Sequence, residues 1–579
     1  MTRVYRDRPR WSAALGVVLC GLLSVAPLLA GDDALARLVP DTAGLCIEAH
    51  DLAGALARLR SGELAKRIEQ HPAMGAGLAR GLAKLSAVRG LLEAQLGISD
   101  ADAGVLLGGE LLIAVWPGTT AGADGNGLLV LRCADEKLLK RVADAIVARQ
   151  REAGRLGSPV IIKHDGRTVE AHTIKTNRAD ARAFLTTVGR LAIVTTDSRT
   201  LVHVVGAAVG FPHDRLLDDL PAYQTAIGRL NPDAPLRLFL NPRRWDEPMH
   251  ALERPAAGRK ALVHDAIGGL WQATDYVSAS LKAADSLQLE IFFGCQQSRL
   301  SEPLRTVFSS LAGPSQLAAS LPPNCLAAAA GRLDVGRMLT GLLDSQSLGK
   351  YELEPPVRLQ QAAALALAGC LGPECGLIIL APSDTAAAGQ PPAAWLCGLQ
   401  THGIGRGRDE PPAATWLVPW LRETVRLASA AAKTRGQQPA LECTLVKQDG
   451  VTLTRISGLP QLPAGETLFL AEQQRMLWFG NSAPFTSQAA KGTLSTPTGN
   501  RRYNALRHPR LDQPSDVLLL DLAEIRRAGN KWTATSGRGS MGWGKLAKLL
   551  PLAGLADGAL LQVQCDAACT AIALHIACD

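Results

Sequence analysis

The stretch most suggestive of chemistry is GSMGWGKL, at positions 539–546. Its glycines and Lys545 have the spacing of a phosphate-binding loop, in which backbone N–H groups cradle the phosphates and the lysine reaches the outer ones. Such a loop needs a Ser or Thr hydroxyl for magnesium directly after the lysine, but Leu546 stands there, and no clear buried strand precedes the stretch. We therefore interpret Lys545 as a solvated lysine at the start of a helix and predict no cofactor.

The histidines do not form a recognisable metal site. The chain has 11 of them, with no HExxH pair and no tight cluster. His164 and His172 flank a predicted hairpin and could approach each other, but the further ligands and second shell that a metal needs are not visible. We predict no metal-binding residue.

Serine and carboxylate catalysis have equally little support. Ser540 is preceded two positions earlier by Arg538, where a nucleophile elbow carries glycine. The carboxylate pairs at 32–33 and 218–219 fit solvated loops or a processing region, and nothing selects an acid and a base. A triad built from distant residues stays open, because triads are defined by geometry rather than by sequence order. We predict no catalytic residue.

The cysteines allow two local disulfides. Of the 12 cysteines only Cys20 lies within the first 30 residues, and no CxxC motif occurs. In an exported protein the short spacings favour Cys565–Cys569 and Cys370–Cys375 as candidate bridges. Four others lie in predicted strands and are expected to be buried small hydrophobic residues: Cys46, Cys133, Cys397 and Cys443.

Length and composition indicate a globular chain of several domains. The protein has 579 residues, 47% of them hydrophobic and 20% charged, which is typical of folded rather than disordered chains. Aromatic residues make up only 4%, which argues against stacking bases or sugars on aromatic platforms. The formal net charge of the chain is +8. The first ten residues contribute +3 of it, from four arginines and one aspartate, so the rest of the chain carries +5. No basic stripe is left to bind nucleic acid.

The N-terminus predicts export. Residues 1–10 are basic, residues 11–30 carry no charge, and GDDALA follows. This order is that of a signal peptide within residues 1–36, with cleavage after Ala30 or Ala36. Twenty apolar residues would also span a bilayer, so an uncleaved anchor is the alternative. We expect a location in the periplasm or cell envelope, with membrane contact only through this segment.

An internal repeat organises the rest of the chain. HDGRTV at 164–169 returns as QDGVTL at 448–453, and YQTAIGRLNPDAPLRLFLN at 223–241 returns as YNALRHPRLDQPSDVLLLD at 503–521. Further landmarks keep their order at a spacing of about 280 residues. Glu110 aligns with Glu374 in the same way, at a somewhat shorter spacing because loop lengths differ. The pattern predicts three segments: repeat 1 at 37–295, a linker at 296–319 and repeat 2 at 320–579.

Each repeat is predicted to be an α+β domain with a largely antiparallel sheet. Asp51 and its counterpart Asp334 are suited to cap a following helix. A helix over 134–154 places Leu138, Val142 and Ile146 on one apolar face. The second repeat predicts its counterpart over 415–436, where Leu417, Leu421 and Val425 share a face. Asp165-Gly166 and Asp449-Gly450 favour tight hairpin turns, because glycine accepts positive φ.

The overall pattern is similar to that of a known group of proteins. It consists of the export signal, a strand–helix–hairpin region, and the segments VPDTAGLCIEAHDL (39–52) and ALARLRSGELAKRIEQHP (55–72). The chain resembles bacterial envelope proteins grouped as a domain of unknown function. The resemblance implies export and transfers no catalytic residue. We expect a non-catalytic exported envelope protein that acts through protein or surface interactions, with an envelope protein as a possible partner. The alternative is a periplasmic hydrolase or small-ligand-binding protein with a site between the two repeats.

Overall fold

The computed structural model describes residues 34–578 apart from several segments. The longest of these segments are 77–89, 248–267, 333–370, 382–393, 402–417, 431–441 and 534–553. The chain divides into two compact units, Met1–Gln296 and Gln297–Asp579. Both units combine helices with a large antiparallel sheet, so the α+β class expected from the sequence is confirmed.

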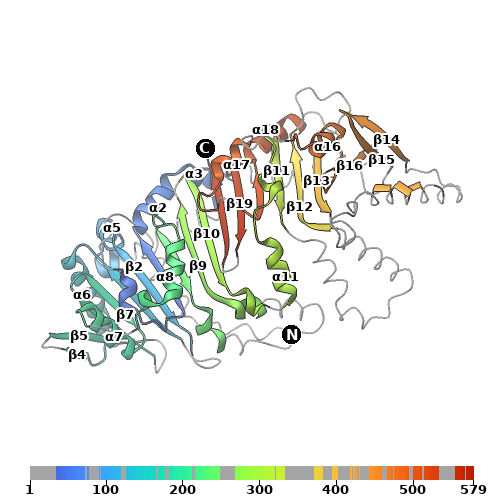
Figure 1. The fold of residues 1–579 in the computed structure, drawn as a ribbon. Coiled ribbons are helices and arrows are strands. Elements are labelled where there is room, and N and C mark those ends of the chain that lie inside the picture. The colour runs from blue at the N-terminus through green and yellow to red at the C-terminus, as the bar shows by residue number, and fades with distance from the viewer. Residues whose placement is uncertain are drawn as a thin grey trace, which may run out of the picture. The chain divides into compact units, whose positions relative to one another are not determined.

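Unit 1 contains an antiparallel sheet whose centre is formed by strands from both ends of the unit (Figure 1). Every neighbouring pair is antiparallel. The order across the sheet is β10 (Ser286–Cys295), β9 (Thr274–Ala283), β8 (Leu236–Leu240), β1 (Leu45–His50), β2 (Glu110–Trp116), β3 (Asn126–Arg132), β7 (Leu191–Thr195), β6 (Arg182–Val188), β5 (Arg167–Lys175) and β4 (Val160–His164).

Helices cover both faces of this sheet. Side chains alternate along a strand, and in β2 Leu112 and Ala114 enter one apolar cluster while Leu111 and Ile113 enter another. The first cluster is completed by η1 (Leu35–Leu38), α7 (Ser198–Ala208), η2 (Leu217–Asp219) and α8 (Pro221–Arg229). The second is completed by α2 (Leu52–Ser61), α5 (Asp100–Leu107) and α6 (Glu136–Glu152). Unit 1 also contains α3 (Glu63–Gln70) and η3 (Pro242–Arg244).

Two local predictions for unit 1 are confirmed. The Asp51 carboxylate accepts a hydrogen bond from Gly54 N at 3.0 Å and caps α2. Helix α6 buries Leu138 and packs Val142 against the same cluster, as predicted, but it buries Val147 rather than the expected Ile146. Asp334 and most of residues 415–436 lie outside the described residues.

The sheet of unit 2 has the same strand order. It runs β20 (Cys569–Ala577), β19 (Gly558–Cys565), β18 (Asp516–Leu520), β11 (Cys325–Gly331), β12 (Leu371–Leu380), β13 (Ala394–Thr401), β17 (Met476–Gly480), β16 (Thr467–Gln473), β15 (Val451–Ser457) and β14 (Glu442–Gln448). One face packs against α12 (Gln316–Ala319), α16 (Ala483–Ala490) and α17 (Arg501–Leu506). The unit also contains η4 (Gln297–Arg299), α11 (Glu302–Leu311) and α18 (Leu522–Thr533).

The outer hairpin of unit 2 turns as its sequence predicts. Asp449 and Gly450 connect β14 to β15, and both have positive φ, at 49° and 79°. Two consecutive residues with positive φ are what a two-residue hairpin turn requires. In unit 1, Asp165 and Gly166 lie outside the described residues, but the flanking His164 and Arg167 pair directly.

The sequence suggested residues 296–319 as a linker, but from Gln297 onward the segment belongs to unit 2. Ala312 forms a parallel bridge with Cys565, and Ser315 is only 2% exposed. The Ser315 N–H donates to the Pro514 carbonyl at 3.1 Å. The segment is therefore anchored to the strands of unit 2.

Among the described residues, no helix is long and apolar enough to cross a membrane.

Candidate functional site

Among the described residues, two glutamates in the sheets, Glu110 and Glu374, are surrounded by polar partners. Glu110 begins β2 opposite His50, the last residue of β1. Glu374 lies in β12 beside Arg332, which directly follows the last residue of β11. The two glutamates therefore occupy equivalent places, Glu110 beside the end of β1 in unit 1 and Glu374 beside the end of β11 in unit 2. We call the groups around them the Glu110 site and the Glu374 site.

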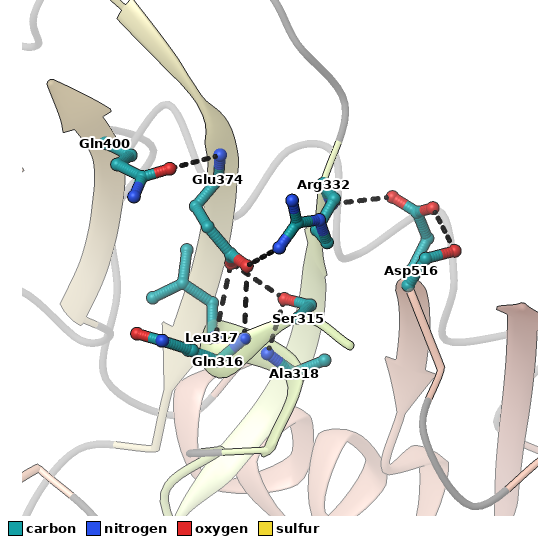
Figure 2. Close-up of polar contacts among 9 residues, drawn as sticks. Ser315, Gln316, Leu317, Ala318, Arg332, Glu374, Gln400 and Asp516 are labelled. Atoms are coloured by element: carbon teal, nitrogen blue, oxygen red, sulfur yellow. Dashed lines mark hydrogen bonds and ion pairs between the residues drawn. The ribbon is translucent and has the colours of Figure 1, made fainter. Parts of the chain in front are cut away.

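The Glu374 carboxylate accepts three hydrogen bonds from the segment before β11 (Figure 2). Its side chain accepts hydrogen bonds from Ser315 Oγ at 2.9 Å, from Gln316 N at 3.2 Å and from Leu317 N at 3.4 Å. Ser315 Oγ in turn accepts from Ala318 N at 3.1 Å. Glu374 is only 4% exposed, and a buried carboxylate is costly unless it is paired in this way. Glu374 thus fixes the start of α12 to the sheet.

Arg332 connects Glu374 to a second, half-buried carboxylate, that of Asp516. Its guanidinium lies 3.9 Å from Glu374 Oε1, and its backbone N–H donates to Asp516 Oδ1 at 3.1 Å. Ser515 Oγ donates to Asp516 Oδ2 at 3.0 Å. Burial, and to a smaller extent the nearby Glu374 charge, raise the pKa of Asp516 above its ordinary value of 3.8. Gly331 is required here, because a Cβ at that position would overlap the Asp516 carboxylate.

The raised pKa of Asp516 predicts a pH-dependent stability. A carboxyl with a higher pKa in the folded than in the unfolded chain stabilises the fold when protonated, below the unfolded value. That contribution disappears as the pH rises through the folded pKa, above 3.8. In Asp516→Asn we therefore expect a smaller decrease of the unfolding free energy with rising pH than in the wild type. Denaturant unfolding of both proteins from about pH 4 to 7 measures this. Parallel pH profiles would contradict it.

The Glu110 site is built from different partners. Arg132 Nη1 lies 2.6 Å from Glu110 Oε2, and His50 Nδ1 lies 3.8 Å from Glu110 Oε1. The other ring nitrogen of His50 is 3.8 Å from Glu48 Oε2, so the imidazole lies between two carboxylates. These distances exceed hydrogen-bond length but permit ion pairs when the imidazole is protonated. Glu48 also accepts a hydrogen bond from the hydroxyl of Tyr223.

Burial determines the chemistry that Tyr223 and Cys46 can perform. Burial, followed by the Glu48 charge, raises the pKa of Tyr223 far above its ordinary range. Burial and then Glu48 also raise the pKa of the Cys46 thiol. Burial therefore favours the protonated Tyr223 hydroxyl, which donates to Glu48, and disfavours a Cys46 thiolate. In unit 2, Tyr503 occupies the same place on its helix, but Ala330 stands where β1 has Glu48. The carboxylate–imidazole–carboxylate arrangement belongs to unit 1.

The structure does not bring the sequence-predicted histidines together. His164 pairs with Arg167 across the β4–β5 hairpin, whereas His172 lies five residues further along β5, opposite Leu185. At about 3.4 Å per residue this separates the two backbones by roughly 17 Å. His172 instead approaches Glu170, with 3.8 Å between Nδ1 and Oε1. Among the described residues, no group of three or more His, Cys, Asp or Glu is arranged to hold a metal.

The other residues considered from the sequence have structural partners or lie outside the description. Asp218 forms an ion pair with Arg37 at 3.1 Å, and the Asp219 carboxylate accepts from Leu216 N at 3.3 Å. The following fall outside the described residues: Asp32, Asp33, Cys370, Ser540 and Lys545.

The cysteines agree in part with expectation. Cys46 and Cys133 are buried, whereas Cys397 and Cys443 are half-buried. Burial, with a contribution from Cys375, raises the pKa of Cys397 to about 12. Cys565 forms no disulfide, and its Sγ lies 3.5 Å from Thr570 Oγ1, so the structure lacks the bridge predicted to Cys569.

Comparison with known proteins adds no family. No protein-family model matches the chain, and no curated protein matches it in sequence. Crystal form III of TP0453 is similar at 10% identity and a TM-score of 0.24, covering 49% of this chain and 88% of that one. Form IV gives 8% identity and a TM-score of 0.23, covering 45% and 80%. Superpositions of this quality carry no argument about fold or function.

Proposed function

We propose that the protein is an exported, non-catalytic component of the cell envelope that acts by binding another protein. The basic residues 1–10 and the uncharged residues 11–30 support export, through a signal peptide or an anchor. Export in turn supports a partner in the envelope or periplasm.

The non-catalytic role is supported mainly by the hydrogen bonds of the Glu374 carboxylate to neighbouring residues of the chain. A general acid or base must offer its proton or lone pair to a substrate. Glu374 is buried, and Ser315, Gln316 and Leu317 occupy its oxygens. Glu110 is likewise paired with Arg132. These contacts support a positioning role, in which the glutamates hold neighbouring segments to the sheets.

We infer further that the chain contains two tandem repeats, at 37–295 and 320–579. Their common strand order supports this, as do the matching places of Glu110 and Glu374 and of Tyr223 and Tyr503. A duplicated architecture presents equivalent surfaces twice. Equivalent exposed surfaces are suited to partner binding.

A crosslinking experiment in the native cells tests the proposal. The full chain carries a C-terminal tag on a flexible linker, and a version lacking residues 2–30 serves as the matched control that is not exported. We expect the exported chain to retain a near-stoichiometric envelope protein that the control lacks. An exported chain that is recovered alone would overturn the proposal. Hydrolysis of fluorogenic ester, peptide or phosphate substrates by that chain would then favour the enzyme alternative.

A further inference from the structure

The outer strand of each sheet exposes an aliphatic side chain at the same position. Ile161 in β4 is 48% exposed, and Leu445 in β14 is 57% exposed. Each lies three residues before the residue that closes the hairpin, His164 in unit 1 and Gln448 in unit 2. Figure 1 shows each of these hairpins at the end of its own unit's sheet. Single exposed aliphatic residues are common on protein surfaces, and here one recurs at the same place in both units.

An exposed lysine accompanies each aliphatic residue. Lys163 and Lys447 lie two positions further along β4 and β14. Residues two apart in a strand share a face, so each outer strand shows an aliphatic and a cationic side chain side by side. A lysine alone on an outer strand is a common device to discourage unwanted strand pairing. An exposed aliphatic side chain beside the lysine instead favours pairing with another strand.

The outer strands can accept a further strand. Among the described strands, β4 is bonded only to β5 and β14 only to β15. A strand paired on one side presents a row of backbone N–H and C=O groups on the other. Extended segments bind such edges through main-chain hydrogen bonds, while the side chains facing each other provide specificity. Directly opposed aliphatic pairs and opposite-charge pairs both favour such pairing.

We propose that β4 and β14 each bind an extended segment of the protein partner, which joins the sheet as an additional strand. The segment carries an aliphatic residue opposite Ile161 or Leu445. Two positions away it carries an acidic residue opposite Lys163 or Lys447. The inference rests on the proposed function and specifies its binding surface and the chemistry of its partner.

Paired substitutions in the tagged, exported chain test this surface. We expect Ile161→Glu with Leu445→Glu to lower partner recovery at least about tenfold, because two apolar contacts are replaced by charges that repel the acidic segment. Lys163→Glu with Lys447→Glu should lower it to a similar extent. Val202→Glu, at a 50% exposed position on α7, is the matched control and should change recovery less than twofold. All these sites are exposed, so thermal midpoints should stay within about 2 °C of the wild type.

The outcomes separate this inference from the proposed function. If the wild type recovers no partner, both are overturned. If the wild type and both double variants recover the same amount, the outer strands are not the surface, while partner binding itself stands. If a glutamate variant fails to fold, Ile161→Thr with Leu445→Thr replaces it, because threonine favours strands. That variant should lose at least about half of the recovery, and unchanged recovery would overturn the inference.

Discussion

Replacing Glu374 by leucine is expected to lower the free energy of unfolding by about 3–5 kcal/mol. Leucine removes the acceptor for Ser315 Oγ and for two backbone N–H groups at the start of α12. It also removes the carboxylate that lies 3.9 Å from the half-buried Arg332 guanidinium. Buried donors that lose their acceptor are penalised by their full desolvation, which is why the expected loss is large. Guanidinium unfolding followed by circular dichroism measures it.

The matched control is Glu374→Gln, which keeps one carbonyl oxygen at the same place. That oxygen can still accept from part of the donor set, so we expect a loss of about 1–2 kcal/mol. A leucine variant no less stable than the glutamine variant would show that these hydrogen bonds do not hold α12 to the sheet.

Truncating Phe239 to alanine is expected to cost about 3–5 kcal/mol through the cavity it leaves in unit 1. Phe239 in β8 is 1% exposed and packs edge-on against Tyr223, with ring centroids 5.2 Å apart. Tyr223 is the hydrogen-bond donor to Glu48. The substitution therefore removes core packing and also the ring contact that orients the Tyr223 hydroxyl. Thermal and guanidinium unfolding of the variant report the loss.

Two controls separate cavity formation from general effects of substitution at Phe239. Phe239→Leu leaves a smaller cavity and should cost about 1–2 kcal/mol. Val202→Ala changes a half-exposed position and should stay within about 0.5 kcal/mol of the wild type. An alanine variant as stable as the leucine variant would contradict the central place of Phe239 in the core.

Much of the local structure could be predicted because its causes are local. The Asp51 cap depends on a residue three positions away, and the Asp449-Gly450 turn depends on the φ preferences of two adjacent residues. The apolar face of α6 follows from its own spacing, visible in Leu138 and Val142. The antiparallel pairing of consecutive strands such as β14 and β15 follows from the hairpins that such turns create.

The two glutamate sites could not be derived in the same way. Tyr223 donates to Glu48 from 175 residues away, and Ser315 reaches Glu374 across 59 residues. Only the packed sheet brings such residues together. A signal was present, however, because Glu110 and Glu374 lie beside long apolar runs and align between the two proposed repeats. A glutamate in such a run must find a partner when it is buried.

The packing of residues 296–319 was missed for a related reason. The position of the stretch between the two proposed repeats predicted a linker. In the structure Ser315 is a buried donor rather than a solvated linker residue. Its partner Glu374 lies in a strand that the sequence did not connect with this stretch.

The most direct test of partner binding at the outer strands is photo-crosslinking in the native cells. A benzophenone amino acid replaces Leu445 in the exported chain, and the same substitution at Val202 is the control. We predict that position 445 captures one envelope protein, through a peptide with an aliphatic and an acidic residue two positions apart. A chain that captures nothing at 445, or the same proteins equally at 445 and 202, would contradict the account.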